Sequence, residues 1–210
     1  MALDLEEQEQ VAELKAWWRQ HGNLIVSVVL AAAVAFAGWQ GWRWYGASQA
    51  AQAAAVFDAL AKAAQGGDAK AVRDSAGTLI ESYPRTLYAS MGGLVAARFH
   101  FDRSDLKAAK AQLEWVREHA PSDEFRDIAR LRLAAIALDE NAPDEALKLL
   151  DAKHGAAYES QYAAMRGDAL LAKNQRADAR AAYQLALEKA VTEQSAFRES
   201  VRMRLEALGS

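Results

Sequence analysis

Residues 158–190 have the sequence YESQYAAMRGDALLAKNQRADARAAYQLALEKA. Alanine, leucine and tyrosine recur at helical spacing on both sides of a short polar break, which predicts one helix over 158–173 and a second over 176–190. Small residues let two such helices approach closely, and a large ring fills the space that remains between them. The residues suited to this contact are Gly167, Ala179, Tyr183 and Ala186. The stretch therefore predicts a helical hairpin.

The same unit recurs toward the N-terminus. Asp68 and Ser104 are each predicted to cap the start of a helix. Pro84 and Pro121, which lie 37 residues apart, each follow the end of a helix pair. Helix pairs that repeat at this period are typical of an α-solenoid, and a final amphipathic helix suits a cap on the last pair. The other predicted helices are 46–64, 68–83, 86–101, 104–119, 122–139, 143–153 and 193–208.

These helix pairs resemble tetratricopeptide repeats, a family in which small and aromatic residues recur at fixed packing positions. The copies lie about 33 to 37 residues apart, and the first, which ends at Pro84, is degenerate. The third copy has Lys153 where a small residue belongs. The residues assigned to repeat packing are Ala97, Ala109, Ala134, Ala146, Gly167, Ala179, Tyr183 and Ala186. Packing alone is sufficient to explain these residues, so we assign none of them to a ligand.

A long apolar segment precedes the helix pairs. Between Arg19 and Arg43 lie 23 residues without a formal charge, and a helix needs about 20 residues to span a bilayer. Tryptophan residues flank the segment on both sides, as expected where indole rings lie at the headgroup level. We therefore predict a transmembrane helix over residues 22–45.

A cleaved signal peptide is the alternative interpretation, because residues 35–37 (AFA) resemble a cleavage site. The stretch before the apolar segment is long and acidic, and apolar residues continue past this site into a tryptophan cluster. Both observations favour an uncleaved anchor.

The orientation of the anchor depends on the basic residues that flank it. Lys15 and Arg19 precede the segment, whereas Arg43 alone follows it closely. The positive-inside rule then favours a cytoplasmic N-terminus and a repeat domain on the opposite side of the membrane.

The predicted span also has a face of small residues. Ala33, Ala37 and Gly41 recur at intervals of four, which places them on one side of a helix. Small residues in this arrangement allow a second transmembrane helix to pack closely. We therefore predict that this face contacts a partner helix, although the general abundance of alanine explains the pattern equally simply.

The composition argues against most other classes of function. The formal net charge is −3 and the pI is about 5.9, so there is no overall basic excess for nucleic acid. Cysteine is absent, and the four histidines are too scattered to form a metal site. The doublets at residues 66–67 and 92–93 lack the residues of a phosphate-binding loop, and predict a loop and a close helix contact, respectively. The sequence predicts no enzyme, no cofactor and no metal.

A wider resemblance rests on the N-terminal pattern LEEQEQ at residues 5–10, Trp17-Trp18 before the span, and the stretch DLKAAKAQLEW at residues 105–115. Together these features resemble the YfgM family over essentially the whole chain. The resemblance implies an ancillary subunit of the bacterial Sec translocon, anchored in the inner membrane with its repeats in the periplasm. It also implies a PpiD-like membrane-anchored periplasmic chaperone as a partner.

The fold class predicted is therefore all-α, with a single N-terminal transmembrane helix followed by an α-solenoid of tetratricopeptide-like helix pairs. We expect a cytoplasmic tail over 1–21, the span over 22–45 and a periplasmic repeat domain over 46–210. The expected function is that of a scaffold or chaperone-like adaptor that binds translocated client polypeptides on its helical repeats. The alternative is a structural organiser of another envelope complex that binds no clients.

Overall fold

The computed structural model describes residues 5–191 and 195–209, and every regular element within these ranges is a helix. The chain divides into two compact units, Met1–Ser48 and Gln49–Ser210, and α1 contributes to both. The helices are α1 (Leu5–Gly66), α2 (Ala69–Ser82), α3 (Leu87–Phe101), α4 (Leu106–His119), α5 (Asp123–Asp139), α6 (Pro143–Leu150), α7 (Glu159–Ala172), α8 (Arg176–Lys189) and α9 (Ser195–Ala207), with a 3-10 turn, η1 (Ala156–Tyr158), before α7. The all-α prediction is confirmed.

In the first unit, α1 carries the apolar segment. One stretch of this helix is long and apolar enough to cross a membrane, and little of it is buried within the protein. Large side chains such as Val34 and Trp42 are 72% and 76% exposed. A core helix of a soluble domain would bury such residues, so their exposure suits contact with lipid.

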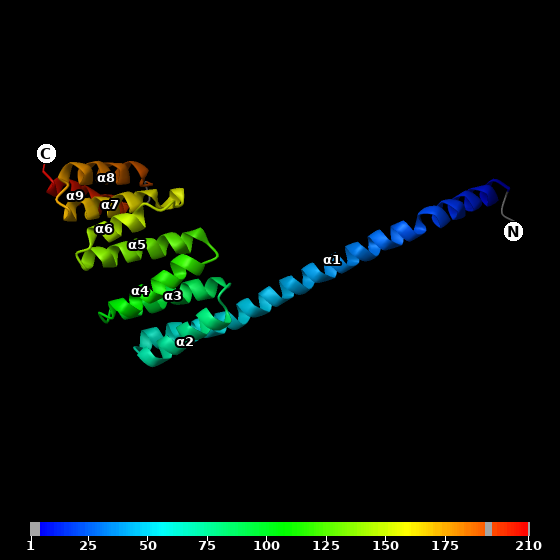
Figure 1. Cartoon of the computed structure of the whole chain (residues 1–210), viewed down its shortest axis with the longest axis horizontal. Coiled ribbons are helices and arrows are strands. Elements are labelled where there is room, and N and C mark those ends of the chain that lie inside the picture. Colours follow the sequence, from blue (N-terminus) through cyan, green and yellow to red (C-terminus); the bar gives the residue numbers. More distant parts are fainter. Residues whose placement is uncertain (1–4, 192–194, 210) are drawn as a thin grey trace. The chain divides into compact units, whose positions relative to one another are not determined.

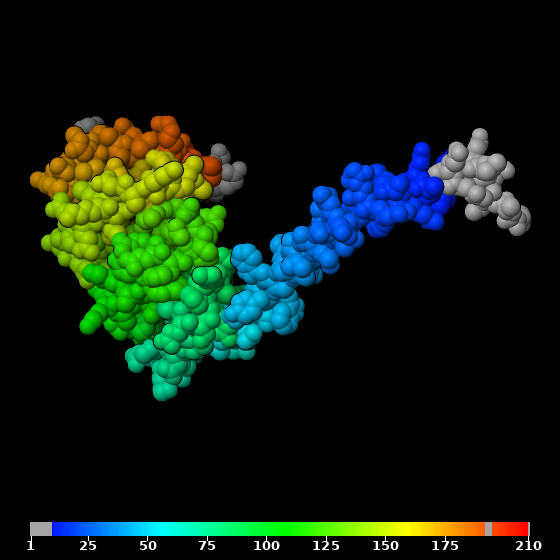
Figure 2. All heavy atoms as spheres, turned by 45° about the vertical axis from the view of Figure 1, so that its right-hand side comes forward, coloured from blue at the N-terminus to red at the C-terminus, as the bar shows by residue number. Residues whose placement is uncertain are grey.

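In the second unit, helices stack in chain order. Figure 1 shows α2 to α8 following one another in the colour order, with the red α9 beside α7 and α8, and in Figure 2 the colours from cyan to orange form successive bands. Buried side chains form four clusters along this stack: α1 with α2 and α3, α3 with α4 and α5, α5 with α6 and α7, and α7 with α8 and α9. Each pair therefore completes its core by packing against the next helix, as in a solenoid.

The turns within the pairs share one geometry. Each contains a residue with positive φ, and the amide of the next residue donates to the carbonyl five positions earlier, which closes the helix end. The residues with positive φ are Gly67 (79°), Ser104 (61°), Asn141 (58°) and Asn174 (62°).

Side-chain caps explain where several helices begin. Asp68 accepts hydrogen bonds from the amides of Lys70 and Ala71, as predicted. The prediction that Ser104 caps the helix ending at His119 is wrong. Ser104 occupies the left-handed turn position, and the carboxylate of Asp105 instead accepts from the Ala108 amide at 3.1 Å.

The helix predicted over 143–153 ends earlier, at Leu150. Beyond it, the buried carboxylate of Asp127 accepts a hydrogen bond from the Gly155 amide at 2.9 Å. Arg130 donates to the carbonyl of Lys153 at 3.3 Å. These contacts with α5 hold residues 151–155 as a loop, so tertiary contacts outweigh helix propensity there. Glu193, the predicted start of the last helix, lies outside the described residues, as do residues 1–4 of the predicted cytoplasmic tail.

Gly92 and Gly93 allow α3 to touch helices on two sides. A Cβ atom on Gly92 would collide with the side chain of Leu79 in α2, and one on Gly93 would lie 2.6 Å from Cγ2 of Val116 in α4. The predicted close helix contact at this doublet is confirmed.

Candidate functional site

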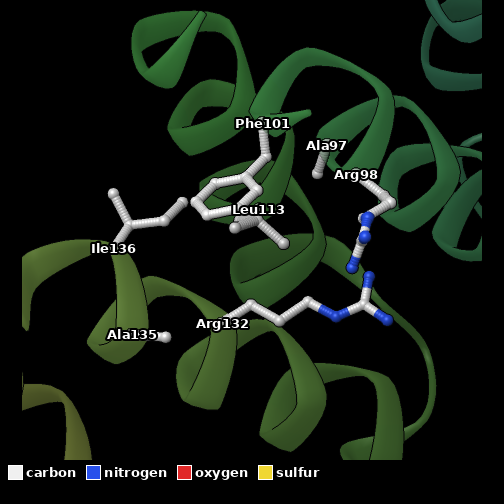
Figure 3. A pocket seen from close by; sticks show the side chains of 7 residues that line it. All are labelled: Ala97, Arg98, Phe101, Leu113, Arg132, Ala135 and Ile136. Atoms are coloured by element: carbon white, nitrogen blue, oxygen red, sulfur yellow. The ribbon is translucent and has the colours of Figure 1, made fainter. Parts of the chain in front are cut away.

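A hollow of about 210 Å³ lies where α3, α4 and α5 meet. Leu113 and Ile136 are almost fully buried and form part of an apolar lining, whereas Phe101 remains 37% exposed. Figure 3 shows these side chains together with those of two arginines. The residues that line the hollow are Ala97, Arg98, Phe101, Leu113, Arg132, Ala135 and Ile136.

The guanidinium groups of Arg98 and Arg132 point toward one another beside this lining (Figure 3). Nε of Arg98 donates to Oδ2 of Asp102, one helical turn along α3, at 2.8 Å. Nη1 of Arg132 donates to the Leu94 carbonyl at 3.2 Å. Within the part of the chain that the structure describes, Arg132 has no ion-pair partner.

The environment of Arg132 disfavours its charge. Partial burial lowers the pKa of the Arg132 guanidinium, and the positive charge of Arg98 lowers it further. The side chain still reaches solvent, so an anion can approach it. An added negative charge would relieve the repulsion between the two arginines.

A second hollow continues from the same arginine pair toward the C-terminal end of α1. The guanidinium of Arg103 lies over the ring of Phe99 at 3.7 Å, and its Nη2 donates to the Gly67 carbonyl at 3.3 Å. This hollow is lined by Ala61, Ala64, Gln65, Leu94, Val95, Arg98, Phe99, Asp102, Arg103 and Arg132. Its charged lining residues are three arginines and one aspartate, so it is locally basic on an acidic protein.

The residues predicted to pack the repeats are buried between helices. A Cβ atom on Gly167 would lie 2.5 Å from the ring of Tyr183, whose hydroxyl donates to Asp168 at 2.7 Å. Burial raises the pKa of both the Tyr183 hydroxyl and the Asp168 carboxyl. Arg204 of α9 forms an ion pair with Asp168 at 2.8 Å, so this contact also holds the last helix.

The predicted small face of the span lies on the exposed surface of α1, with Ala33, Ala37 and Gly41 all accessible. A Cβ atom on Gly41 would meet nothing within 4 Å. Among the described residues, no group of histidine, cysteine, aspartate or glutamate has an arrangement that could hold a metal ion.

Sequence reasoning missed Arg98 and Arg132, because neither belongs to a recognised motif. One signal marks them. In the register that aligns Ala97 with Ala134, Arg98 aligns with Ala135, and Arg132 aligns with Val95. All four of these positions line the two hollows. At each of these two positions an arginine thus replaces the small or apolar residue of the neighbouring repeat, and both positions lie on the surface of the two hollows.

Comparison with known proteins places this architecture in a family. Residues 15–210 match the family model described as tetratricopeptide repeat-like domain. The chain belongs to this family. No solved structure matches it.

Several curated relatives of this chain share the name "Ancillary SecYEG translocon subunit". The protein from Neisseria gonorrhoeae is 29% identical over 209 residues, covering 99% of this chain and 100% of the relative. The one from Haemophilus influenzae is 27% identical and covers 89% of this chain and 91% of the relative. The one from Escherichia coli is 25% identical and covers 96% of each. The resemblance predicted from the sequence is confirmed.

Proposed function

We propose that this chain is a non-catalytic, membrane-anchored adaptor of the Sec translocon in the bacterial inner membrane. The observation that carries the proposal is the similarity of nearly the entire chain, apolar segment and repeats together, to proteins named ancillary SecYEG translocon subunits. In this proposal residues 22–45 span the membrane, residues 1–21 lie in the cytoplasm and residues 46–210 lie in the periplasm.

The finer part of the proposal concerns what the repeats bind. A stack of helix pairs presents an extended surface, and the two hollows beside Arg98 and Arg132 are recesses in it. An anchor beside the translocation channel raises the effective concentration of this surface near emerging chains. The proposed ligands are translocated client polypeptides, and a PpiD-like membrane-anchored periplasmic chaperone is the proposed partner.

Orientation can be tested with single thiols, because the natural chain contains no cysteine. Ala177 on α8 and Ala12 in the tail are both exposed, so Ala177→Cys and Ala12→Cys are matched variants. In intact spheroplasts, a membrane-impermeant maleimide should label the first variant and not the second. Labelling of Ala12→Cys alone would place the repeats in the cytoplasm and overturn the proposed topology.

The adaptor role can be tested by photo-cross-linking in cells. A photoreactive residue at Val34 in the span should cross-link to SecYEG. One at Phe101 beside the hollow should cross-link to an arrested secretory chain, whereas one at Lys107, exposed on α4, should do so much less. Cross-links to SecYEG without any to the secretory chain would replace client binding with a purely structural role, and an absence of cross-links to SecYEG would overturn the translocon assignment.

A further inference from the structure

The arginine pair of the repeat unit is a charged site that packing does not require. Arg98 has only the carboxylate of Asp102, an exposed pair one turn apart on the same helix, which contributes little to stability. Arg132 uses one donor for the Leu94 carbonyl, while a guanidinium has five N–H donors in a planar fork. Two such groups facing one another form a site suited to a carboxylate.

The hollow beside the pair has the size and lining of a receptor for one side chain. Its volume of about 210 Å³ is below the roughly 300–1,000 Å³ of pockets that enclose drug-sized ligands. Leu113, Ile136 and the ring of Phe101 provide an apolar lining, visible beside the arginines in Figure 3. A large apolar side chain that enters it would lose contact with water and would be stabilised there.

The second hollow indicates how the ligand runs. It shares Arg98 and Arg132 with the first and extends away from them toward α1. Recesses therefore lie on both sides of the arginine pair. A polypeptide that occupies both recesses continues past the arginine pair, so the carboxylate that it presents there belongs to a side chain. A C-terminal carboxylate at the pair would leave one of the two recesses empty.

We propose that Arg98 and Arg132 together bind the side-chain carboxylate of an acidic residue within an extended polypeptide segment, and that the adjoining apolar hollow binds a large apolar side chain of the same segment. This site would select acidic-apolar segments among polypeptides near the membrane. The inference deepens the proposed function, on which it rests only for the source of the polypeptide.

The test uses the full chain in nanodiscs and short synthetic peptides that are acetylated and amidated, so that they have no terminal charge. One peptide carries a glutamate two residues from a leucine in a serine-glycine background, with an uncharged dye for fluorescence anisotropy. Three counterparts differ by glutamine for glutamate, by alanine for leucine, or by a free C-terminal carboxylate in place of the glutamate side chain. The protein variants are Arg132→Gln, Arg98→Gln and the control Arg73→Gln, which alters an exposed arginine on α2 outside both hollows.

We expect the glutamate peptide to bind about tenfold more tightly than the glutamine peptide, the usual order for a charge-assisted hydrogen bond. Arg132→Gln and Arg98→Gln should each lose about the same factor. With the glutamine peptide, these two variants should bind no more weakly than the natural protein does. The arginine substitution and the glutamine substitution each remove the same interaction, so their effects do not add. Arg73→Gln should bind like the natural protein, and the alanine peptide should bind more weakly than the leucine peptide.

Equal binding of the glutamate and glutamine peptides to the natural protein would overturn the inference, and this comparison leaves the fold of the protein untouched. Tighter binding of the peptide with the free terminus would overturn the choice of a side-chain carboxylate. Equal binding of the alanine and leucine peptides would remove the apolar half of the site. None of these outcomes affects the cross-links to SecYEG, so failure of this inference and failure of the translocon role are distinguishable.

Discussion

Gly167 illustrates how one atom can limit the packing of a repeat. Its Cα faces the ring of Tyr183, and Gly167→Ala would bring a Cβ atom within 2.5 Å of that ring. We expect a loss of about 1–3 kcal/mol in the free energy of unfolding, the range for overpacking a core. The measurement is denaturation of the full chain in detergent, monitored by circular dichroism.

Gly77 provides the matched control for this substitution. It lies inside α2, and an added Cβ atom would meet nothing within 4 Å. Gly77→Ala should stabilise the protein by about 0.5–1 kcal/mol, because alanine favours the helix. Equal stability of Gly167→Ala and the natural protein would contradict the packing role assigned to Gly167.

Tyr162 should make the fold sensitive to alkali. Burial, with a further contribution from the negative charge of Asp127, raises the pKa of its hydroxyl to about 12, against about 10 in an unfolded chain. The contribution of Tyr162 to stability is thus complete below pH ~10 and is lost as the pH rises through ~12, to a limit of about 2–3 kcal/mol. Tyr162→Phe should lose less stability over this interval, as measured by denaturation at each pH. An identical decline in both proteins would refute the assignment.

At the scale of single elements, two neighbouring residues have different roles at the start of α4. Asp105 accepts a hydrogen bond from the Ala108 amide, whereas Ser104 has a φ of 61° and supplies the turn. Asp105→Ala should cost about 1 kcal/mol through the lost cap. Ser104→Gly should be neutral or stabilising, because glycine adopts positive φ without strain. Unfolding transitions of the two variants give the comparison, and the reverse order would restore Ser104 as the cap.

The small face of α1 remains a prediction at the same scale. Ala37→Leu places a bulky side chain on this face, whereas Ala35→Leu places the same side chain on nearly the opposite side of the helix. If a partner helix packs there, the first variant should recover less SecYEG in a pull-down from detergent extracts. Equal recovery by the two variants would leave the face without a packing role.

At the scale of the whole repeat unit, α9 closes the last pair. Val201 is fully buried in the cluster with α7 and α8, and Nη1 of Arg198 donates to the carbonyls of Leu187 and Ala190 at the end of α8. Val201→Ala should cost about 1–3 kcal/mol. Because neighbours stabilise neighbours in a solenoid, hydrogen exchange should accelerate in α7 and α8 more than in α3 and α4. Met203→Ala, which alters a side chain that is 57% exposed, is the control, and a uniform change in exchange would contradict this local coupling.

Prediction from the sequence succeeded where one residue type decides the structure. Asp68 caps α2 as predicted, and the glycine doublet at residues 92–93 marks a helix contact. It failed where the rest of the fold selects between local options. Asp127 and Arg130 end α6 early through contacts made from another helix.

The arginine pair escaped prediction for a related reason. Arg98 and Arg132 come together only because α3 and α5 both border the same hollow. No local spacing encodes that meeting. The sequence offers one signal without the fold, because both residues depart from the repeat pattern.

The four matching turns bear on how proteins of this kind change length. Every pair is closed by the same backbone geometry, and the buried clusters connect each pair to the next helix along the chain. Duplication or loss of one complete helix pair would therefore bring together packing surfaces that are already complementary. Insertion of a single helix would leave that helix without a partner to pack against. Evolution of the repeat unit is expected to proceed in whole pairs, with the anchor and the closing helix retained at its two ends.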